Sequence, residues 1–223
     1  MNIEGLVSDI ECKVLYDLAK NCKNAIVEIG SFKGKSTVWL AKGSKAGYGV
    51  KVYAIDPHNG MGDWSLHLGE INTFEDFKNN IKNAGVEDIV APLVKTSAEA
   101  IGDILEPIGL IFVDGGHEYK DVKLDFDLWF PKLAEHGIIA FHDTDWIGPK
   151  QVVRDLVHNY KETRSSRRIG SIWFAEKVDH NSRTDRFRNR YILLVGHTYE
   201  TAYELNLPKP IRETGKKILK LIQ

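Results

Sequence analysis

The segment from Val27 to Thr37 constrains the fold of this chain more than any other stretch. It joins an apolar run to a glycine turn and a helix start. Gly30 would let a ligand approach the backbone closely, and Gly34 would let the helix begin tightly against the sheet. Such a turn exposes backbone N–H groups and the positive end of a helix dipole. Because the carboxylate of Glu28 would repel a phosphate, the segment predicts a site for a cationic ligand with amino and hydroxyl donors.

Two phosphate-binding motifs share part of this pattern and are kept as alternatives. A P-loop has four residues between its glycines, whereas only residues 31–33 lie between the glycines here. Lys35 and a strand ending in Asp114 would otherwise suit that motif. The missing residue disfavours it, because a P-loop wraps a phosphate with successive N–H groups. A dinucleotide-binding fingerprint is disfavoured more strongly, since Phe32 stands where its second glycine belongs.

Apolar runs and amphipathic stretches alternate along the chain, as strands and helices do in an α/β protein. One helical face is predicted from Val122, Phe126, Trp129 and Leu133. The alternation predicts a Rossmann-like, doubly wound, mostly parallel sheet with helices on both faces. We expect strands at about 25–29, 50–55, 89–94, 110–114 and 137–142, and closing strands at 169–175 and 191–195.

Length and composition limit the class of protein. The chain has 223 residues, of which 43% are hydrophobic and 27% charged. This predicts a single domain over 1–223, with a core at about 5–176 and a C-terminal extension at 177–223. The net charge of −1 argues against a nucleic-acid binder, and no apolar run reaches a membrane-spanning length. We therefore expect a protein that binds neither nucleic acid nor membrane. The two cysteines do not require a disulfide, so we expect a cytoplasmic protein.

Polar side chains follow the predicted strands at the end where such sheets bind their ligands. Asp56 ends the second strand, where a carboxylate can accept hydrogen bonds from both hydroxyls of a ribose. The alternative is a turn aspartate before Pro57. The carboxyl ends of the parallel strands should gather these residues on one rim: Glu28 to Gly34, Asp56, Ser97, Asp114, His117, His142 and Asp143.

A family resemblance rests on these residues. The pattern Glu28-x-Gly30-x-x-x-Gly34, followed by Asp56, Ser97 and Asp114, resembles the class I S-adenosylmethionine-dependent methyltransferases. Residues 111–119 and 137–144 are similar to the small enzymes grouped as methyltransferase domain 24, relatives of catechol-type and macrolide-sugar O-methyltransferases. The resemblance covers about residues 5–176.

The resemblance implies a set of residues that hold S-adenosylmethionine. Glu28 and the Gly30 backbone would hold the methionine end, with Ser36 nearby at the helix start. Asp56 would hold the ribose, and Ser97 would lie near the adenine. The complete set of expected cofactor-binding residues is Glu28, Gly30, Ser31, Gly34, Ser36, Asp56, Ser97 and Asp114.

A second constellation, Asp114, His142 and Asp143, predicts a divalent metal site. Neighbouring strands lie about 4.8 Å apart, so the ends of the fourth and fifth strands bring the two carboxylates together. Oxygen ligands favour Mg²⁺, whereas the histidine shifts the preference toward Mn²⁺, Fe²⁺ or Zn²⁺. In the alternative without a metal, Asp143 caps the following turn and His142 is a hydrogen-bonded rim residue.

His117 and Asp143 are the expected catalytic residues. His117 stands three residues after Asp114, at the place where the resemblance implies a lysine base in the catechol-type enzymes. A neutral imidazole, with a pKa of about 6.5, could accept a hydroxyl proton there. The alternative is a surface histidine over a helix start.

Together these features predict metal-assisted O-methylation of a hydroxyl on a sugar-like or phenol-like small molecule. S-adenosylmethionine would be the methyl donor, with Mg²⁺ or Mn²⁺ as a second cofactor and a homo-oligomer as a possible assembly. The alternatives are a metal-independent N- or C-methyltransferase, a non-catalytic S-adenosylmethionine-binding module and a P-loop NTPase.

Two further segments carry weaker signals. The long loop at 59–72, with Trp64 and His67, suggests either a lid over the acceptor or an ordinary loop. An apolar stripe at 211–222 predicts a C-terminal helix that packs on the domain or on a second subunit.

Overall fold

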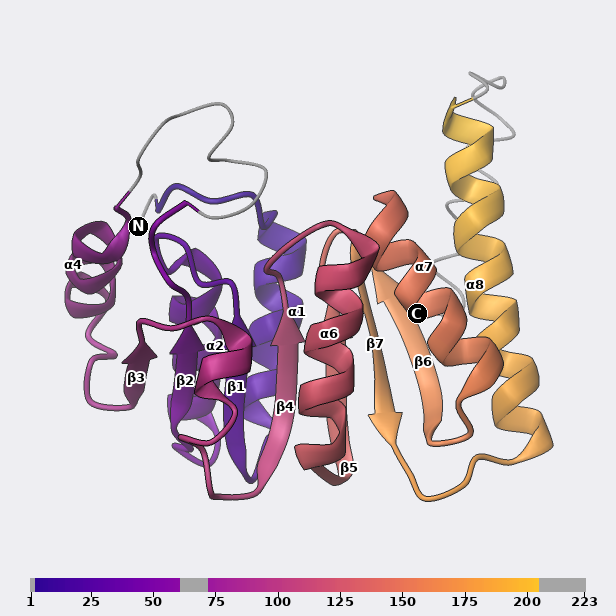
Figure 1. The fold of residues 1–223 in the computed structure, drawn as a ribbon, viewed down its shortest axis with the longest axis horizontal. Helices are drawn as coiled ribbons and strands as arrows, with labels where there is room; N and C mark the ends of the chain where they lie inside the picture. Colours follow the sequence, from indigo (N-terminus) through magenta and orange to yellow (C-terminus); the bar gives the residue numbers. More distant parts are fainter. Residues whose placement is uncertain (1–2, 61–71, 205–223) are drawn as a thin grey trace.

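Seven strands form one sheet at the centre of the protein (Figure 1). The structure, a computed structural model, describes residues 3–60 and 72–204, with side chains up to residue 196. The strands are β1 (Ala25–Ile29), β2 (Val52–Ile55), β3 (Val90–Leu93), β4 (Ile108–Val113), β5 (Leu133–Phe141), β6 (Thr163–Ile169) and β7 (Ile172–Lys177). Their order is β3-β2-β1-β4-β5-β7-β6. The first five in that order are parallel, and β7 is antiparallel to β5 and β6, as predicted for a mostly parallel sheet.

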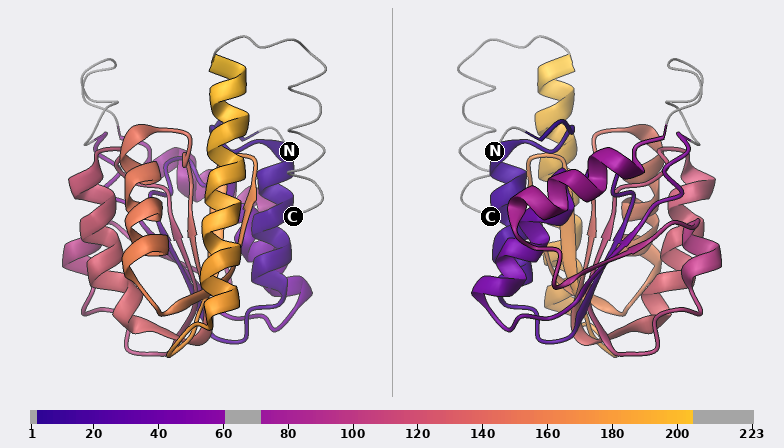
Figure 2. Two further views of the ribbon diagram at one scale, coloured as in Figure 1. Left: turned by 90° about the vertical axis from the view of Figure 1, so that its right-hand side faces the viewer. Right: turned by 90° about the vertical axis from the view of Figure 1, so that its left-hand side faces the viewer.

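Helices cover both faces of the sheet, which appears edge-on between two helical layers in Figure 2. The helices are α1 (Asp9–Lys20), α2 (Lys35–Ala46), α4 (Phe74–Ala84), α5 (Ser97–Ala100), α6 (Tyr119–Trp129), α7 (Ile147–Asn159) and α8 (Arg183–Glu204). One core lies between the sheet and α1, α2 and α4, and the other lies under α5, α6 and α7. The doubly wound architecture predicted from the sequence is confirmed.

Strand β1 illustrates why the central strands are apolar throughout. All five of its residues are buried. Alternate side chains of a strand point to opposite faces, so Ile26 joins the core under α1 and α2 while Val27 joins the core under α6. Both faces are covered, so the strand needs no polar side. Glu28 is nevertheless placed in this strand, which marks it as a residue of the site.

One strand prediction near the C-terminal end of the sheet is wrong, and another is confirmed only in part. Residues 191–195, expected to be a strand, lie within α8, which packs on β6 and buries Ile192 to 2% exposure. A short apolar run does not by itself distinguish a strand from the buried face of a helix. The predicted strand 169–175 is confirmed over residues 172–175, which belong to β7, whereas Gly170 (φ 63°) turns the chain just before them. The edge strand is the polar β6, which the sequence did not predict.

The predicted helical face on α6 is confirmed for Val122, Phe126 and Trp129, which are all buried. Leu133 does not belong to this face, because it is the first residue of β5. Pro131 lies in the intervening turn of 3-10 helix at residues 130–132, where proline, which cannot donate a backbone N–H, ends the α-helix.

Some expectations lie outside the described residues. These include Trp64 and His67 of the long loop and the C-terminal helix predicted at 211–222. Within residues 3–60 and 72–204, the structure contains no helix with both the length and the apolar character needed to cross a membrane.

Candidate active site

The glycine turn after β1 is held against the end of β4. Gly30 has a φ of 88°, and a Cβ at this position would lie 2.1 Å from the carbonyl oxygen of Asp114. Its N–H donates to the carbonyl of Ile55 on the neighbouring strand at 2.9 Å. Only glycine therefore fits here, both for its backbone conformation and for the close approach of the β4 end.

Asp56, at the end of β2, holds the next residues of the turn. Its Oδ2 accepts from the N–H groups of Ser31 (2.9 Å) and Phe32 (2.8 Å), and its Oδ1 accepts from the N–H of His58 (2.6 Å). The expectation that this turn presents its N–H groups to a ligand is therefore wrong for Ser31 and Phe32. The P-loop alternative fails for the same reason, and the ammonium of Lys35 donates to the Gly5 carbonyl at 3.1 Å.

Gly34 begins α2 in the left-handed conformation, with a φ of 85°. A Cβ at this position would lie 3.1 Å from the Phe77 ring, so the glycine makes room for α4 and not, as expected, for the sheet. The predicted tight start of the helix is confirmed, but the element that packs against Gly34 is α4 and not the sheet.

Glu28 is fully buried beneath the turn, with 0% exposure. Burial raises its pKa to about 7, although the nearby hydroxyls of Ser36 and Thr37 favour the ionised form. Thr37 donates to Oε2, whereas Oε1 and the Ser31 hydroxyl have no hydrogen-bond partner among the described residues. Two unpartnered buried oxygens are costly unless a ligand supplies donors, so this spot fits the amino group of a ligand.

Ser97, the expected adenine residue, begins α5 immediately after the β3 end. Its hydroxyl donates to Oδ1 of Asp125 on α6. Sequence reasoning did not identify Asp125, although a charged residue among the apolar positions of that helix is a detectable signal.

The strand ends of β4 and β5 bring together the three predicted metal ligands. Nδ1 of His142 lies 2.9 Å from Oδ1 of Asp114 and 3.1 Å from Oδ2 of Asp143. One donor atom from each residue lies within 4.8 Å of the others. Neither imidazole nitrogen makes a hydrogen bond of good geometry with the described residues. Two carboxylates and an imidazole at this spacing are a donor set that fits a divalent cation.

Glu11 completes this cluster from a distant part of the chain. Its Oε2 lies 3.6 Å from Nε2 of His142 and accepts from Ser8, in the capping box of α1. Its Oε1 accepts from the N–H (2.6 Å) and the hydroxyl (2.7 Å) of Ser171, in the β6–β7 turn. The sequence did not predict this role of Glu11, because no local signal reports contacts with residues so far along the chain.

The charges of the cluster stabilise one another. Burial alone would lower the pKa of His142, but the carboxylates of Asp114, Asp143 and Glu11 outweigh it and raise that pKa to about 12. Burial opposes ionisation of Asp143 and Glu11, yet the histidines and hydrogen bonds hold both pKa values well below their usual range. The carboxylates thus favour a positive charge at this point of the rim, and a divalent cation would take the place of the Nδ1 proton of His142.

His117 and Asp143, the two expected catalytic residues, are in direct contact. Nε2 of His117 lies 2.9 Å from Oδ2 of Asp143. The imidazole also stacks on Trp146, with ring centroids 4.7 Å apart. Asp143 has a φ of 49°, a strained conformation of the kind that concentrates at functional sites.

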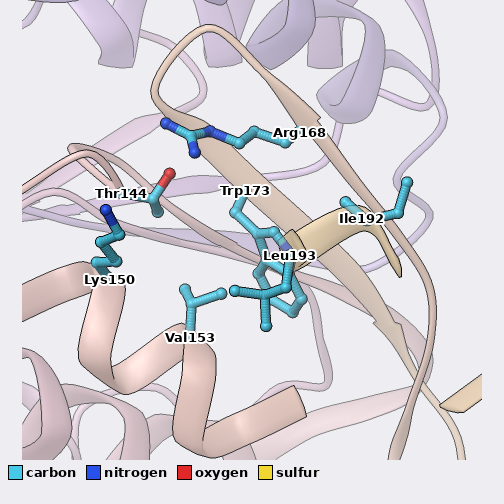
Figure 3. A pocket seen from close by; sticks show the side chains of 7 residues that line it. All are labelled: Thr144, Lys150, Val153, Arg168, Trp173, Ile192 and Leu193. Carbon is cyan, nitrogen blue, oxygen red and sulfur yellow. The ribbon is translucent and has the colours of Figure 1, made fainter. Parts of the chain in front are cut away.

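A cavity that is open to solvent adjoins this rim between α7, α8 and the β6–β7 pair (Figure 3). Thr144, Lys150 and Arg168 surround its polar end. Because none of the predicted site residues lines it, the cavity and the strand-end cluster are separate features. Its lining residues are Thr144, Lys150, Val153, Arg168, Trp173, Ile192 and Leu193.

Known proteins resemble this chain in sequence. Residues 27–144 match the model of a protein family described as a methyltransferase domain. Over 122 residues the chain is 33% identical to the uncharacterized protein y4gI of Sinorhizobium fredii (strain NBRC 101917 / NGR234). This match covers 54% of the chain but only 13% of that relative's length.

Solved structures share the fold. The O-methyltransferase TomG from Streptomyces achromogenes, involved in tomaymycin synthesis and solved in complex with SAM, has 19% identity and a TM-score of 0.60. The likeness covers 78% of this chain and 82% of TomG. An O-methyltransferase from Bacillus cereus in complex with SAH has 18% identity and a TM-score of 0.59, over 77% of this chain and 83% of that enzyme.

Proposed function

This chain belongs to the methyltransferase domain family whose model spans residues 27–144, and from that premise we propose that it methylates a hydroxyl oxygen of a small molecule. S-adenosylmethionine is the proposed methyl donor, and a sugar-like or phenol-like compound is the proposed acceptor. The donor proposal draws support from TomG and the Bacillus cereus enzyme, which were solved with SAM and SAH.

The methionine end of the donor is assigned to the glycine turn and to Glu28 beneath it. Glu28 Oε1 and the Ser31 hydroxyl are buried there without partners, and an ammonium group supplies the donors that they lack. Asp56 keeps its proposed role at the ribose, since Oδ1 accepts one N–H and can accept another donor. When bound, S-adenosylmethionine supplies an electrophilic methyl group to the acceptor oxygen.

The observation that carries O-methylation is the His117–Asp143 pair on the same rim. In this proposal the imidazole of His117 takes the proton of the acceptor hydroxyl as the oxygen becomes nucleophilic. Asp143, 2.9 Å away, orients the ring and stabilises the imidazolium that forms. Trp146 packs on that ring and limits its rotation. The chain's contribution is thus positioning and proton transfer.

Asp114, His142 and Asp143 are the residues proposed to hold a divalent metal. Such an ion would bind the acceptor hydroxyl and lower its pKa. Glu11, which lies beside Nε2 of His142, would keep the opposite nitrogen directed at the ion.

Calorimetric titration with S-adenosylhomocysteine tests the donor site. Wild-type protein should bind in the micromolar range, and Glu28→Gln should bind at least about tenfold more weakly, because it lacks the charge that pairs with the ammonium group. Asp127→Asn, at an exposed α6 residue that pairs with Lys123, is the matched control and should bind normally. Absence of binding in the wild type would overturn the proposal.

A transfer assay with methyl-labelled donor and a panel of hydroxylated acceptors tests the chemistry. Product carrying the label on oxygen is expected, with activity lost in EDTA and restored by Mg²⁺ or Mn²⁺. Undiminished activity in EDTA would contradict the metal and favour metal-independent transfer. Label on nitrogen or carbon would contradict O-methylation itself.

A further inference from the structure

Asp125 is a buried carboxylate that the proposed reaction leaves without a role. It lies on the inner side of α6, and only 6% of its surface is exposed. Its neighbours along that face, Val122 and Phe126, belong to the apolar core. A buried carboxylate at such a position is unfavourable unless hydrogen-bond donors satisfy both of its oxygens.

The protein satisfies only one of those oxygens. Ser97 donates its hydroxyl to Oδ1, and no described residue donates to Oδ2. A Cβ on Gly115 would lie 3.6 Å from Oδ2 and 3.5 Å from the Ile29 side chain. Because Gly115 has no side chain, Oδ2 stays uncovered toward the rim, beside the ends of β1 and β4.

The position of this oxygen matches one end of the proposed donor. Glu28 and Ser31 lie under the β1 turn, and Asp56 lies at the end of β2. Ser97 follows β3, the strand on the other side of β2, and its partner Asp125 comes from the helix that follows β4. A ligand with its ammonium at Glu28 and its ribose at Asp56 would extend its base toward the Ser97–Asp125 pair.

We propose that Asp125 recognises the adenine of the methyl donor by accepting a hydrogen bond from its exocyclic amine, with Ser97 positioning the carboxylate. This inference rests on the proposed function, since it takes S-adenosylmethionine as the ligand. Adenine offers an amine donor at this edge, whereas hypoxanthine offers a carbonyl acceptor that a carboxylate would repel. Asp125 is therefore a specificity-determining residue for the base.

The charge state of Asp125 suits this role. Burial raises its pKa to about 6, while the Ser97 hydroxyl lowers it and the negative charge of Asp121 raises it. The side chain is thus ionised at neutral pH and acts only as an acceptor. A site whose buried acceptor is left unpaired rejects a ligand that lacks the matching donor.

The test compares S-adenosylhomocysteine with S-inosylhomocysteine, which carries hypoxanthine, by calorimetry at pH 7.5. Wild-type protein should prefer the adenosyl ligand strongly. In Asp125→Asn the side-chain amide can donate to the hypoxanthine carbonyl, so the preference ratio should fall at least about tenfold. Asp127→Asn, the same substitution on the exposed side of α6, should leave the ratio unchanged. Ser97→Ala should lower the ratio by a smaller factor, because it removes the donor that positions Asp125.

The outcomes separate this inference from the proposed function. If Asp125→Asn weakens both ligands equally, or neither, while the wild type binds S-adenosylhomocysteine, Asp125 is structural and the inference alone is overturned. If the wild type binds neither ligand, the proposed function is overturned and the inference with it. Should Asp125→Asn fail to fold, an unchanged ratio in Ser97→Ala would overturn the inference.

Discussion

The two halves of the rim are built in different ways, although both lie at the carboxyl ends of adjacent strands. In the half around β1 and β2, Glu28 receives its hydrogen bond from Thr37, a residue close to it in the chain. In the half around β4 and β5, Glu11 reaches Ser171 and His142 from the N-terminal helix. Glu28 thus finds its partner within its own strand–turn–helix segment, although Asp56 reaches the same turn from β2, whereas Glu11 joins segments from opposite ends of the chain.

The electrostatics differ in the same way. Glu28 is nearly isolated from positive charge, so burial raises its pKa to about 7. In the other half, carboxylates and imidazoles neutralise one another, and the pKa of Asp143 is held well below its usual range. We infer that the first half is prepared for a cationic group from outside, whereas in the second half the carboxylate of Asp143 stays ionised beside the imidazole of His117.

The largest expected effect separates binding from chemistry. Asp143→Asn should reduce methyl transfer by about 100- to 10,000-fold, because the imidazolium of His117 loses its carboxylate partner. Binding of S-adenosylhomocysteine should change less than about twofold, since Asp143 lies in the other half. Asparagine tolerates the positive φ at this position, so the fold should persist. A loss of ligand affinity equal to the loss of rate would contradict the division into halves.

The next effect concerns Gly30, where the turn after β1 lies against the end of β4 and the two halves meet. Gly30→Ala should destabilise the protein by at least about 3 kcal/mol, because the new methyl group would lie 2.1 Å from the Asp114 carbonyl oxygen. Gly85→Ala is the control, since Gly85 also has a positive φ but open space around it, and it should cost about 1 kcal/mol. Urea unfolding of both variants measures the difference, and equal costs would refute the close approach.

A smaller effect follows from the raised pKa of Glu28. Below pH 4.5 the carboxyl is protonated in both the folded and the unfolded chain. As pH rises through about 7, the ligand-free protein should lose on the order of 1–3 kcal/mol of stability, because the folded state resists ionisation. Affinity for S-adenosylhomocysteine should rise over the same range, since the ionised form pairs with its ammonium group. Glu28→Gln should flatten the affinity profile and make the loss of stability smaller than in the wild type, where Asp125 also contributes to it. A wild-type affinity that does not change with pH would disprove the assignment.

The smallest effect sharpens the role of Trp146 in the second half. Trp146→Ala should lower kcat by roughly two- to tenfold, because stacking is worth about 0.5–1.5 kcal/mol and no longer restrains His117. Trp39→Ala is the matched control, at a partly exposed residue of α2 whose ring contacts Tyr16. If both variants lower kcat equally, Trp146 has no specific effect on His117.

Much of the architecture followed from patterns in the sequence. The strands that became β1 to β5 were predictable because apolar runs between helical stretches report burial on both faces. The pattern failed at residues 191–195, where the same apolar character serves the buried side of α8. The apolar pattern also did not reveal β6, because a strand at the edge of a sheet is partly exposed and can be polar.

In the candidate site, the grouping of the strand-end residues was predictable, whereas their individual hydrogen bonds were not. The ends of parallel strands meet at one rim, so Asp114, His142 and Asp143 were expected together, and the structure brings their donor atoms within 4.8 Å. The use of Asp56 was not predictable in detail, because its hydrogen bonds to Ser31 and Phe32 depend on how the turn folds.

The sequence by itself determined the glycine turn, the order of the strands from β1 to β5, and the gathering of Asp114, His142 and Asp143 at one rim. These properties depend on local backbone conformation and on the periodicity of apolar residues, which neighbours in the chain decide. Only the tertiary structure decided that Glu11 supports His142, that Ser97 holds Asp125 and that the turn's N–H groups are used by Asp56. Those contacts join segments far apart in the chain, and their geometry is set by how the helices pack on the sheet.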